Sequence, residues 1–201
     1  MSHQRACLSS AEQPHRLKSL WVLIGILALA LSLTAPTAHA ATTEEGGDVP
    51  VVSGRVEAGD VSAAAYLRIA NYNSRKCLVA QGPNNGAPAF QTDCASFIDQ
   101  YWQLESVGTH GGYTAFRIRN YNSGKCLVVQ GPNNGSQGFQ FDCASFVDQY
   151  WWPVIDTTGN YMMLQNVNSG KCLVVQGTAN GSRAFQFDCH SEFADQWWYR
   201  P

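Results

Sequence analysis

The ten residues NSGKCLVVQG run from Asn122 to Gly131 and return unchanged from Asn168 to Gly177. A third version, NSRKCLVAQG, occupies residues 73–82. The cysteine of this decapeptide falls at positions 77, 126 and 172, so the copies follow one another at steps of 49 and 46 residues. A period in this range is typical of proteins built from repeated supersecondary units.

Each copy reads as a set of short strands. An alternating stretch such as FRIRN precedes the decapeptide, KCLVVQ inside it is a short β-branched run, and FQFDC and an aromatic stretch such as QYWQL follow. Asn-Gly pairs at 85–86, 134–135 and 180–181 favour the positive φ angles of tight turns. The pattern predicts four strands per copy, twelve in all, and no stretch beyond residue 40 shows helical periodicity.

Four short strands cannot bury their own apolar face, but three copies around a pseudo-threefold axis can do so by closing a barrel. A propeller is the competing architecture, because its blades also have four strands and about 40–45 residues. Propellers typically need four to eight blades, whereas this sequence has three copies. We therefore predict a closed all-β fold over residues 64–201, with repeats at about 64–110, 111–158 and 159–201.

The first 40 residues have the composition of a secretory signal peptide. Arg5, Arg16 and Lys18 form a basic segment, residues 20–33 are apolar, and Ala40 ends a stretch of small residues. Because a membrane-spanning helix needs about 20 apolar residues, we predict cleavage after Ala40 and secretion, with an uncleaved anchor as the alternative. Residues 41–63 are predicted as a flexible leader, in which VPVV at 49–52 could add a strand.

Removal of residues 1–40 leaves six cysteines and a net charge of about −4. No basic patch stands out, which argues against nucleic acid and anionic membranes as partners. Neither Cys-x-x-Cys nor clustered histidine is present, so we predict no metal and no cofactor. His110 and His190 have no evident Ser or Cys partner, so no catalytic residue is predicted. We expect a non-catalytic monomer.

The two cysteines of each copy are always 17 residues apart. Six cysteines allow 15 pairings, but the threefold symmetry of the sequence favours three local disulfides. In the chain-entropy model a closed loop of this size contributes roughly 3 kcal/mol. One disulfide per repeat is therefore predicted, and the pairs are Cys77 with Cys94, Cys126 with Cys143, and Cys172 with Cys189.

Each copy ends on Gln-x-Trp, at residues 100–102, 149–151 and 196–198. This recurring motif resembles the ricin-B-type lectin family, also found as family 13-like carbohydrate-binding modules of secreted bacterial enzymes, and the resemblance covers about residues 64–201. It implies a β-trefoil, which is a six-stranded barrel capped by three hairpins, with an intra-repeat disulfide at each Cys pair. It also implies that Trp102, Trp151 and Trp198 pack in the core near the threefold axis.

The resemblance further implies a shallow sugar pocket on each lobe, and here the match is partial. The family has an Asp two residues after the first Cys, where this chain has Val79, Val128 and Val174. It has an aromatic residue two positions before the second Cys, where this chain has Thr92, Phe141 and Phe187. It has an Asn before the Gln of Gln-x-Trp, where this chain has Asp99, Asp148 and Asp195.

The chemistry of such a pocket is simple, because a carboxylate accepts hydrogen bonds from sugar hydroxyls and an aromatic ring stacks on the C–H face of the sugar. The predicted carbohydrate-binding residues are Phe141, Asp148 and Gln149 in copy two, Phe187, Asp195 and Gln196 in copy three, and Asp99 and Gln100 in copy one.

Two further triplets leave alternatives open. Gln81, Gln130 and Gln176 either belong to a rebuilt pocket or cap the following turn. The middle residue of Gln-x-Trp, which is Tyr101, Tyr150 or Trp197, either forms an exposed platform for sugar or covers the outer wall of the barrel, packing on Phe97, Phe146 or Phe193.

The sequence thus predicts a secreted carbohydrate-binding module with weak, multivalent recognition of a polysaccharide or glycan. The alternative is a trefoil that has lost sugar binding and binds a protein, as an inhibitor or adhesion partner. For that alternative the candidate loop is Glu105–Ala115, which is longer than its counterpart in copy three.

Overall fold

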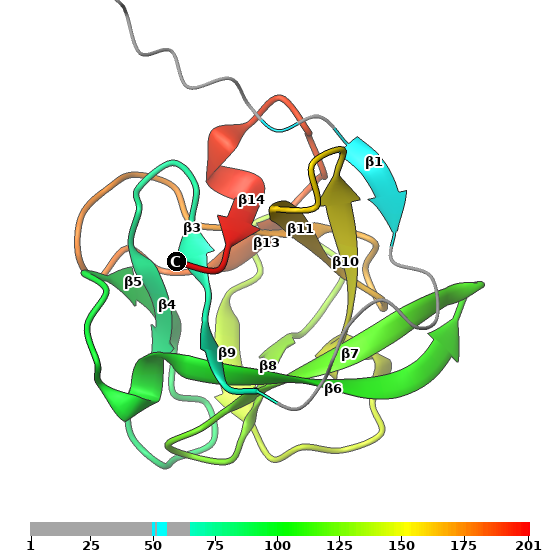
Figure 1. Cartoon of the computed structure of the whole chain (residues 1–201). Coiled ribbons are helices and arrows are strands. Elements are labelled where there is room, and N and C mark those ends of the chain that lie inside the picture. The colour runs from blue at the N-terminus through cyan, green and yellow to red at the C-terminus, as the bar shows by residue number, and fades with distance from the viewer. Residues whose placement is uncertain (1–49, 51, 56–64) are drawn as a thin grey trace, which may run out of the picture. The chain divides into compact units, whose positions relative to one another are not determined.

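The computed structural model describes residues 50, 52–55 and 65–201, and the predicted signal peptide lies outside this part of the chain (Figure 1). The strands of the described residues form one 14-stranded sheet. Three short 3₁₀ turns, η1 (Ile98–Gln100), η2 (Val147–Gln149) and η3 (Ala194–Gln196), accompany them. Within this part of the chain, no helix has the length and apolar character required to cross a membrane.

The strands fall into three consecutive groups, one for each copy of the sequence. Copy one holds β2 (Leu67–Arg68), β3 (Ala70–Asn71), β4 (Cys77–Ala80), β5 (Ala89–Thr92) and β6 (Tyr101–His110). Copy two holds β7 (Tyr113–Asn120), β8 (Cys126–Val129), β9 (Gly138–Phe141) and β10 (Tyr150–Asp156). Copy three holds β11 (Tyr161–Asn166), β12 (Cys172–Val174), β13 (Phe185–Phe187) and β14 (Trp197–Tyr199). Since β2 and β3 are one strand interrupted at Ile69, the prediction of four strands per copy is confirmed.

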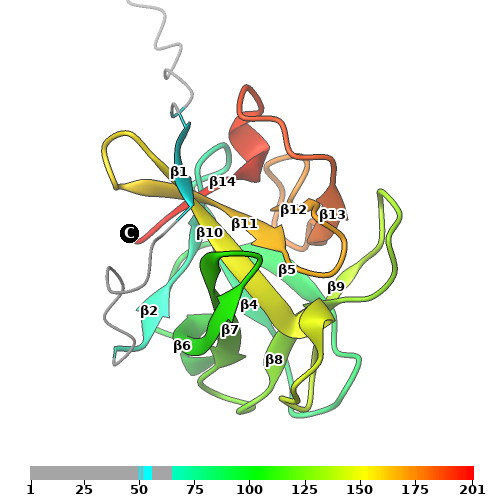
Figure 2. The same ribbon diagram turned by 90° about the vertical axis from the view of Figure 1, so that its right-hand side faces the viewer.

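Antiparallel pairing closes six strand positions into a barrel. Starting from β2, the order is β6, β7, β10, β11 and β14, and β14 pairs with β3 to complete the circle. The remaining strands form the three hairpins β4–β5, β8–β9 and β12–β13, which lie together at one end of the barrel (Figures 1 and 2). A six-stranded barrel with three hairpins is the predicted β-trefoil.

The core contains the tryptophan of each Gln-x-Trp motif. Trp102, Trp151 and Trp198 are fully buried in one apolar cluster with Leu78, Leu127 and Leu173. Each indole N–H donates to the backbone carbonyl of the leucine in its own copy, over N···O distances of 2.9, 3.1 and 3.1 Å. The ring therefore fills apolar volume while its one polar atom is satisfied. The three predicted disulfides, Cys77–Cys94, Cys126–Cys143 and Cys172–Cys189, are present.

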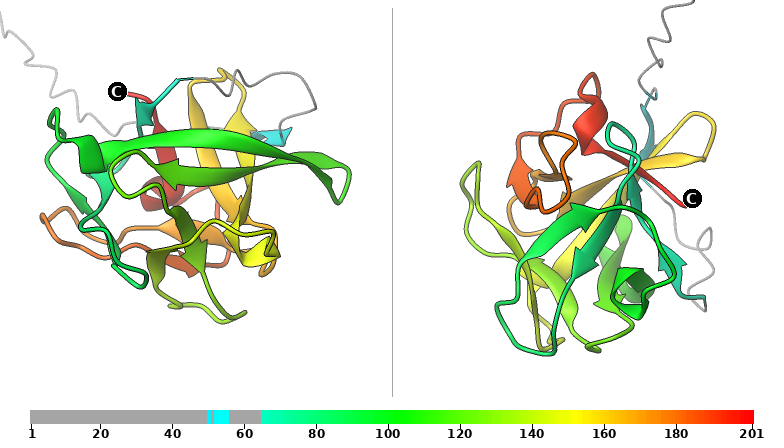
Figure 3. Two further views of the ribbon diagram at one scale, coloured as in Figure 1. Left: turned by 90° about the horizontal axis from the view of Figure 1, so that it is seen from below. Right: turned by 90° about the vertical axis from the view of Figure 1, so that its left-hand side faces the viewer.

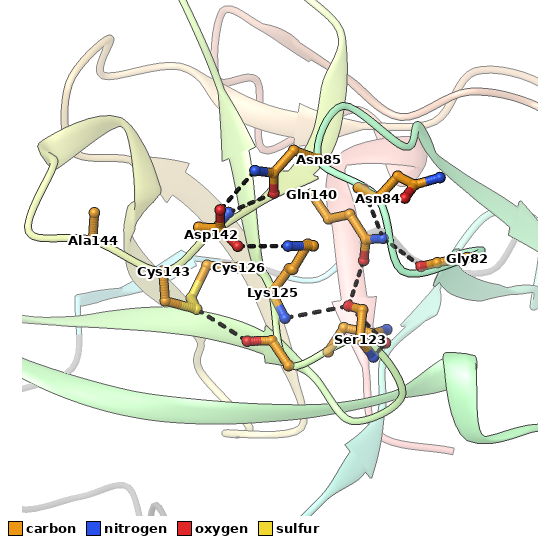
Figure 4. A network of polar contacts seen from close by, with 12 residues as sticks. Gly82, Asn84, Asn85, Ser123, Lys125, Cys126, Gln140, Asp142, Cys143 and Ala144 are labelled. Carbon is orange, nitrogen blue, oxygen red and sulfur yellow. Dashed lines mark hydrogen bonds and ion pairs between the residues drawn. A yellow bond between two sulfur atoms is a disulfide. The ribbon is translucent and has the colours of Figure 1, made fainter.

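A polar network joins each hairpin to the one before it in the chain, as Figure 4 shows for copies one and two. The buried Gln140 side chain accepts from the Ser123 hydroxyl at 2.6 Å and donates to the Gly82 carbonyl of copy one at 2.7 Å. The Asn85 side chain donates to the Asp142 carboxylate at 2.7 Å and accepts from the Asp142 backbone N–H at 2.9 Å. The same bonds recur around Gln186 and around Gln91, so the three copies are linked in a ring.

The Asn-Gly pairs therefore have a second role beside turn formation. Only the glycines have positive φ, at 81°, 84° and 85° for Gly86, Gly135 and Gly181. The preceding asparagines stay at negative φ and use their side chains to bond the neighbouring copy. This differs from a turn in which both central residues have positive φ.

The structure adds detail to two segments. Within the predicted flexible leader, where the sequence leaves a strand at 49–52 open, β1 (Val52–Arg55) pairs antiparallel with β10. The segment Glu105–Ala115, predicted as a loop, forms the ends of β6 and β7 and a tight turn at Gly111–Gly112. Both glycines have positive φ, 57° and 87°, which suits a two-residue hairpin turn. Figure 3 shows this hairpin extending beyond the strands around it.

Replacement of Trp151 by alanine is expected to lower the free energy of unfolding by about 3–5 kcal/mol, because it removes a fully buried ring and leaves a cavity. Chemical denaturation followed by circular dichroism measures this loss. A loss below about 1 kcal/mol would show that the ring contributes little to the core.

The Gln140→Met variant is expected to be destabilised by about 2–4 kcal/mol, because it leaves the buried hydrogen-bonding groups around Gln140 without their partner. Gln137→Met is the matched control, since the Gln137 side chain is exposed and donates only to the nearby Gly135 carbonyl at 3.1 Å. Equal stability of the two variants, measured by denaturation, would contradict a structural role for the inter-copy amide.

Candidate functional site

The outer face of each hairpin carries the residues predicted to bind sugar. In copy two, Leu127 and Val129 of β8 point into the core. Cys126 and Val128 alternate with them and so occupy the other face. Across the hairpin, Phe141 pairs with Cys126. The turn η2, which contains Asp148, packs against β8.

The position at which the family has an acidic residue is buried and inaccessible to a ligand in every copy. Val79, Val128 and Val174 are each only 1% exposed. A buried valine offers neither a hydrogen bond nor an open surface to a ligand. In each copy the 3₁₀ turn that follows the hairpin contains an aspartate.

These carboxylates are Asp99, Asp148 and Asp195, which are all half-buried. The Oδ1 atom of each is buried and has no hydrogen-bond partner among the described residues. Burial raises the pKa of Asp148, because it penalises the charged form, and hydrogen bonds that include one from the Gln130 amide offset this only in part. Burial likewise raises the pKa of Asp195. An orphan buried carboxylate oxygen is unusual in a folded protein.

The glutamines predicted beside them are not open to a ligand. Gln149 is buried, its Oε1 accepts from the Ala144 backbone N–H and its Nε2 donates to the Asp142 carbonyl, both at 2.9 Å. Gln100 and Gln196 make the equivalent pair of bonds in their own copies. The structure thus corrects their predicted role, because both halves of each amide hold the loop between the second cysteine and the Gln-x-Trp motif.

At the position two residues before the second Cys, copies two and three have an aromatic ring that solvent reaches, and copy one does not. Phe141 is 41% exposed and Phe187 is half-buried, so both present a ring edge or face to solvent, while copy one has Thr92. The interpretation of the middle residue of Gln-x-Trp as an exposed platform for sugar is wrong for copies two and three, because Tyr150 and Trp197 are buried. The Trp197 ring packs with Val154 and Met163. These rings cover the outer wall of the barrel.

Sequence reasoning missed the exposure of the residue that precedes each 3₁₀ turn. Phe97 and Phe146 are 68% and 66% exposed, and Phe193 is also exposed. In copy three, Phe193 and Asp195 line a hollow of about 270 Å³ together with Asn73 of copy one. The recurring apolar pair before the Asp, as in SFVDQ, is the signal that could have indicated an exposed tip beside the carboxylate.

Within the described part of the chain, no group of three or more His, Cys, Asp or Glu side chains is arranged to hold a metal ion.

The family model of ricin-type beta-trefoil lectin domain-like proteins matches residues 55–143 and 98–187, so the chain belongs to this family. A search of curated proteins finds no match. The matched region includes the three disulfide loops apart from the last few residues of the third.

Three solved structures illustrate the likeness in fold. The designed threefold-symmetric protein ThreeFoil has a TM-score of 0.62 and 24% identity, over 67% of this chain and 96% of its own. The Macrolepiota procera ricin B-like lectin in complex with lactose has a TM-score of 0.59 and 19% identity, over 70% of this chain and 99% of its own. The exo-β-1,3-galactanase of Clostridium thermocellum has a TM-score of 0.63 and 23% identity, over 70% of this chain and 30% of its own. At these identities the likeness concerns the fold. A ricin-B-like lectin fold suggests a carbohydrate-binding module.

Two classes of aspartate should be distinguishable by carboxyl-carbon NMR across pH. The Lys125 ammonium, assisted by Asn85, lowers the pKa of Asp142, and the corresponding Lys and Asn partners lower those of Asp93 and Asp188. Burial raises the pKa of Asp148 and Asp195. On acidification Asp148 and Asp195 should therefore take up their protons first. Titration of Asp142 above Asp148 would contradict the environment described for the candidate site.

Proposed function

We propose that this chain is a secreted, non-catalytic carbohydrate-binding module that recognises a polysaccharide or glycan through lobes two and three. The observation that carries the proposal is the orphan Oδ1 of Asp148 and Asp195 on the same lobe as a solvent-accessible ring, Phe141 or Phe187. Lobe one has the equivalent Asp99 but no ring at Thr92.

The chemistry of these two groups suits a sugar. A buried carboxylate oxygen without a donor costs about 1–3 kcal/mol or more, and a sugar hydroxyl would supply the missing hydrogen bond. The Phe141 ring offers its face to the C–H groups of the same sugar. The role given to Asp148 replaces that of the acidic residue at the Val128 position, so the proposed pocket is an altered form of the family pocket.

Binding at each lobe should be weak. One ring and few hydrogen bonds on an open surface gain little over water, so a dissociation constant around millimolar is expected. Two lobes held at a fixed distance can engage one polymer, and effective concentration then raises the overall affinity without new contacts. A single chain therefore needs no second copy to bind a polymer usefully.

Secretion and the lack of catalysis rest on separate observations. Three disulfides suit an oxidising compartment, and the sequence begins with a basic, then apolar, then small-residue pattern. Glycoside cleavage needs two carboxyl groups about 5–10 Å apart. The candidate carboxylates belong to three different lobes related by pseudo-threefold symmetry, which argues against such a pair.

A second candidate function is protein binding, and the exposed tips favour it. Phe97 and Phe146 are each followed by another exposed apolar residue, Ile98 or Val147. Exposed apolar pairs at loop ends are suited to contacts with a protein partner. These tips therefore provide the comparison against which the sugar pocket is tested.

Double replacement of Phe141 and Phe187 by alanine is expected to abolish binding to immobilised polysaccharide, because both stacking surfaces are lost. Affinity electrophoresis against xylan, galactan, mannan and chitin first identifies the polysaccharide that retards the parent protein most. Thr92→Ala is the matched control at the corresponding position of copy one, and it should bind as the parent does.

Two outcomes would contradict the proposal. One is a folded double variant, with an unchanged unfolding midpoint, that binds the polysaccharide as tightly as the parent. The other is loss of binding in the double variant Phe97→Ser and Phe146→Ser while the pocket variant still binds, which would place recognition at the loop tips.

The double variant Asp148→Asn and Asp195→Asn tests the carboxylates and should weaken polysaccharide binding by at least about tenfold.

A further inference from the structure

We propose a second ligand site on this protein, in a hollow between β1 and the outer wall of the barrel, with the chemistry to bind a sugar that carries a carboxylate. The hollow has a volume of about 310 Å³. It is lined by Gly54 and Arg55 of β1, Tyr113 of β7, Val154, Met163 and Gln165 of β10 and β11, and Cys189 of the third disulfide. The hollow borders lobe three through Cys189 but is lined by none of the proposed sugar-binding residues, so the inference does not rest on the proposed pockets of lobes two and three.

The strand that borders the hollow, β1, has no counterpart in the other two lobes among the described residues. β1 lies alongside β10, as Figure 2 shows, with Arg55 opposite Val154. Trp152, which lies beside this hollow, is replaced by Gln103 and Tyr199 at the matching positions of copies one and three. The symmetry of the sequence therefore does not explain this site, and the residues around it must be considered individually.

Arg55 is held in a defined position. Its guanidinium carbon lies 4.7 Å from the ring centroids of both Tyr113 and Trp152. Its Nε donates to the Gln165 Oε1 at 3.1 Å, and one of its terminal nitrogens, Nη2, donates to the same oxygen. Gln165 is fixed in turn, since its Nε2 donates to the Gly170 carbonyl at 2.6 Å. Aromatic and amide contacts of this kind orient a guanidinium without neutralising it.

Arg55 differs from other arginines of the protein in its partners. Among the described residues no carboxylate forms an ion pair with Arg55, whereas Arg117 and Arg119 both pair with Glu105. Among the described residues that line the hollow, Arg55 carries the only charge. A half-buried cation without an ion-pair partner among the described residues favours an anionic group from outside the chain.

The geometry of the arginine indicates which anion. Gln165 occupies the Nε side of the guanidinium, so the edge formed by Nη1 and the second hydrogen of Nη2 is left for a ligand. That edge has two parallel N–H groups, which match the two oxygens of a carboxylate. The half-buried Tyr113 ring supplies an apolar surface that suits the C–H face of a pyranose, whereas Val154 and Met163 line the hollow but are largely buried. A volume of about 310 Å³ is at the lower end for ligand pockets, which fits a single sugar residue.

The test uses ¹⁵N-labelled protein titrated with glucuronic acid at neutral pH, with glucose as the neutral probe of the same size. The Arg55 side-chain Nε–H resonance and the backbone resonances of β1 should shift with glucuronic acid in the millimolar range and not with glucose. Arg55→Gln should weaken glucuronic acid binding at least about tenfold, because it removes the charged donors. Arg68→Gln is the matched control, since Arg68 lies 5.9 Å from the Tyr101 ring in lobe one.

A second variant covers the case in which Arg55→Gln releases β1 from the barrel. Gln165→Glu keeps Arg55 in place and puts a carboxylate on it from within the chain, so it should also abolish binding while β1 amides stay protected. Phe141→Ala with Phe187→Ala should bind glucuronic acid normally, which separates this site from the proposed pockets. Full binding by Arg55→Gln or by Gln165→Glu would overturn the proposal. Equal binding of glucose, or of inorganic sulfate, would overturn the assignment to a carboxylate-bearing sugar.

Discussion

A buried glutamine amide in the middle of each hairpin, such as that of Gln140, joins its own copy to the copy before it in the chain. The Oε1 atom of Gln140 accepts a hydrogen bond from the Ser123 hydroxyl, and its Nε2 donates to the backbone carbonyls of Gly82 and Asn84. One copy alone leaves these groups without partners, and burying unpaired polar groups is costly. Three copies satisfy all of them, because the third bonds back to the first. The same constraint accounts for the repetition of the decapeptide, because its serine donates a hydrogen bond to the buried glutamine of each copy.

The hydrogen bonds and ion pairs that join the hairpins determine which aspartates have partners within the described part of the chain. The Lys and Asn partners of Asp93, Asp142 and Asp188 hold these carboxylates in ion pairs and in bonds between copies. Asp99, Asp148 and Asp195 remain, with one oxygen each that no described residue satisfies. Two sets of aspartates thus have opposite roles, one in joining the copies and one in the candidate pockets. For that reason the pKa values of Asp93, Asp142 and Asp188 are lowered, whereas burial raises those of Asp148 and Asp195.

The sequence predicted the features that depend on local pattern or on symmetry. Strand positions followed from alternation of apolar residues, and the disulfides followed from the constant spacing of cysteines in three copies. Features that depend on contacts between distant segments were missed. Gln149 was assigned to sugar because no pattern shows that both its amide atoms meet the backbone five to seven residues away. Trp197 was considered as an exposed platform because Val154 and Met163, which pack against it, lie in other strands. The pairing of β1 with β10 spans about a hundred residues, and it creates the hollow around Arg55.

The roles of Asp148 and Asp195 as sugar-binding carboxylates are tested most directly by a crystal structure of the protein with an oligosaccharide cut from the polysaccharide that it binds best. We expect a sugar hydroxyl within hydrogen-bond distance of Oδ1 of Asp148 or Asp195, a sugar ring against Phe141 or Phe187, and no sugar beside Thr92. A bound sugar that leaves both of these Oδ1 atoms without a partner, or that occupies lobe one, would contradict these roles.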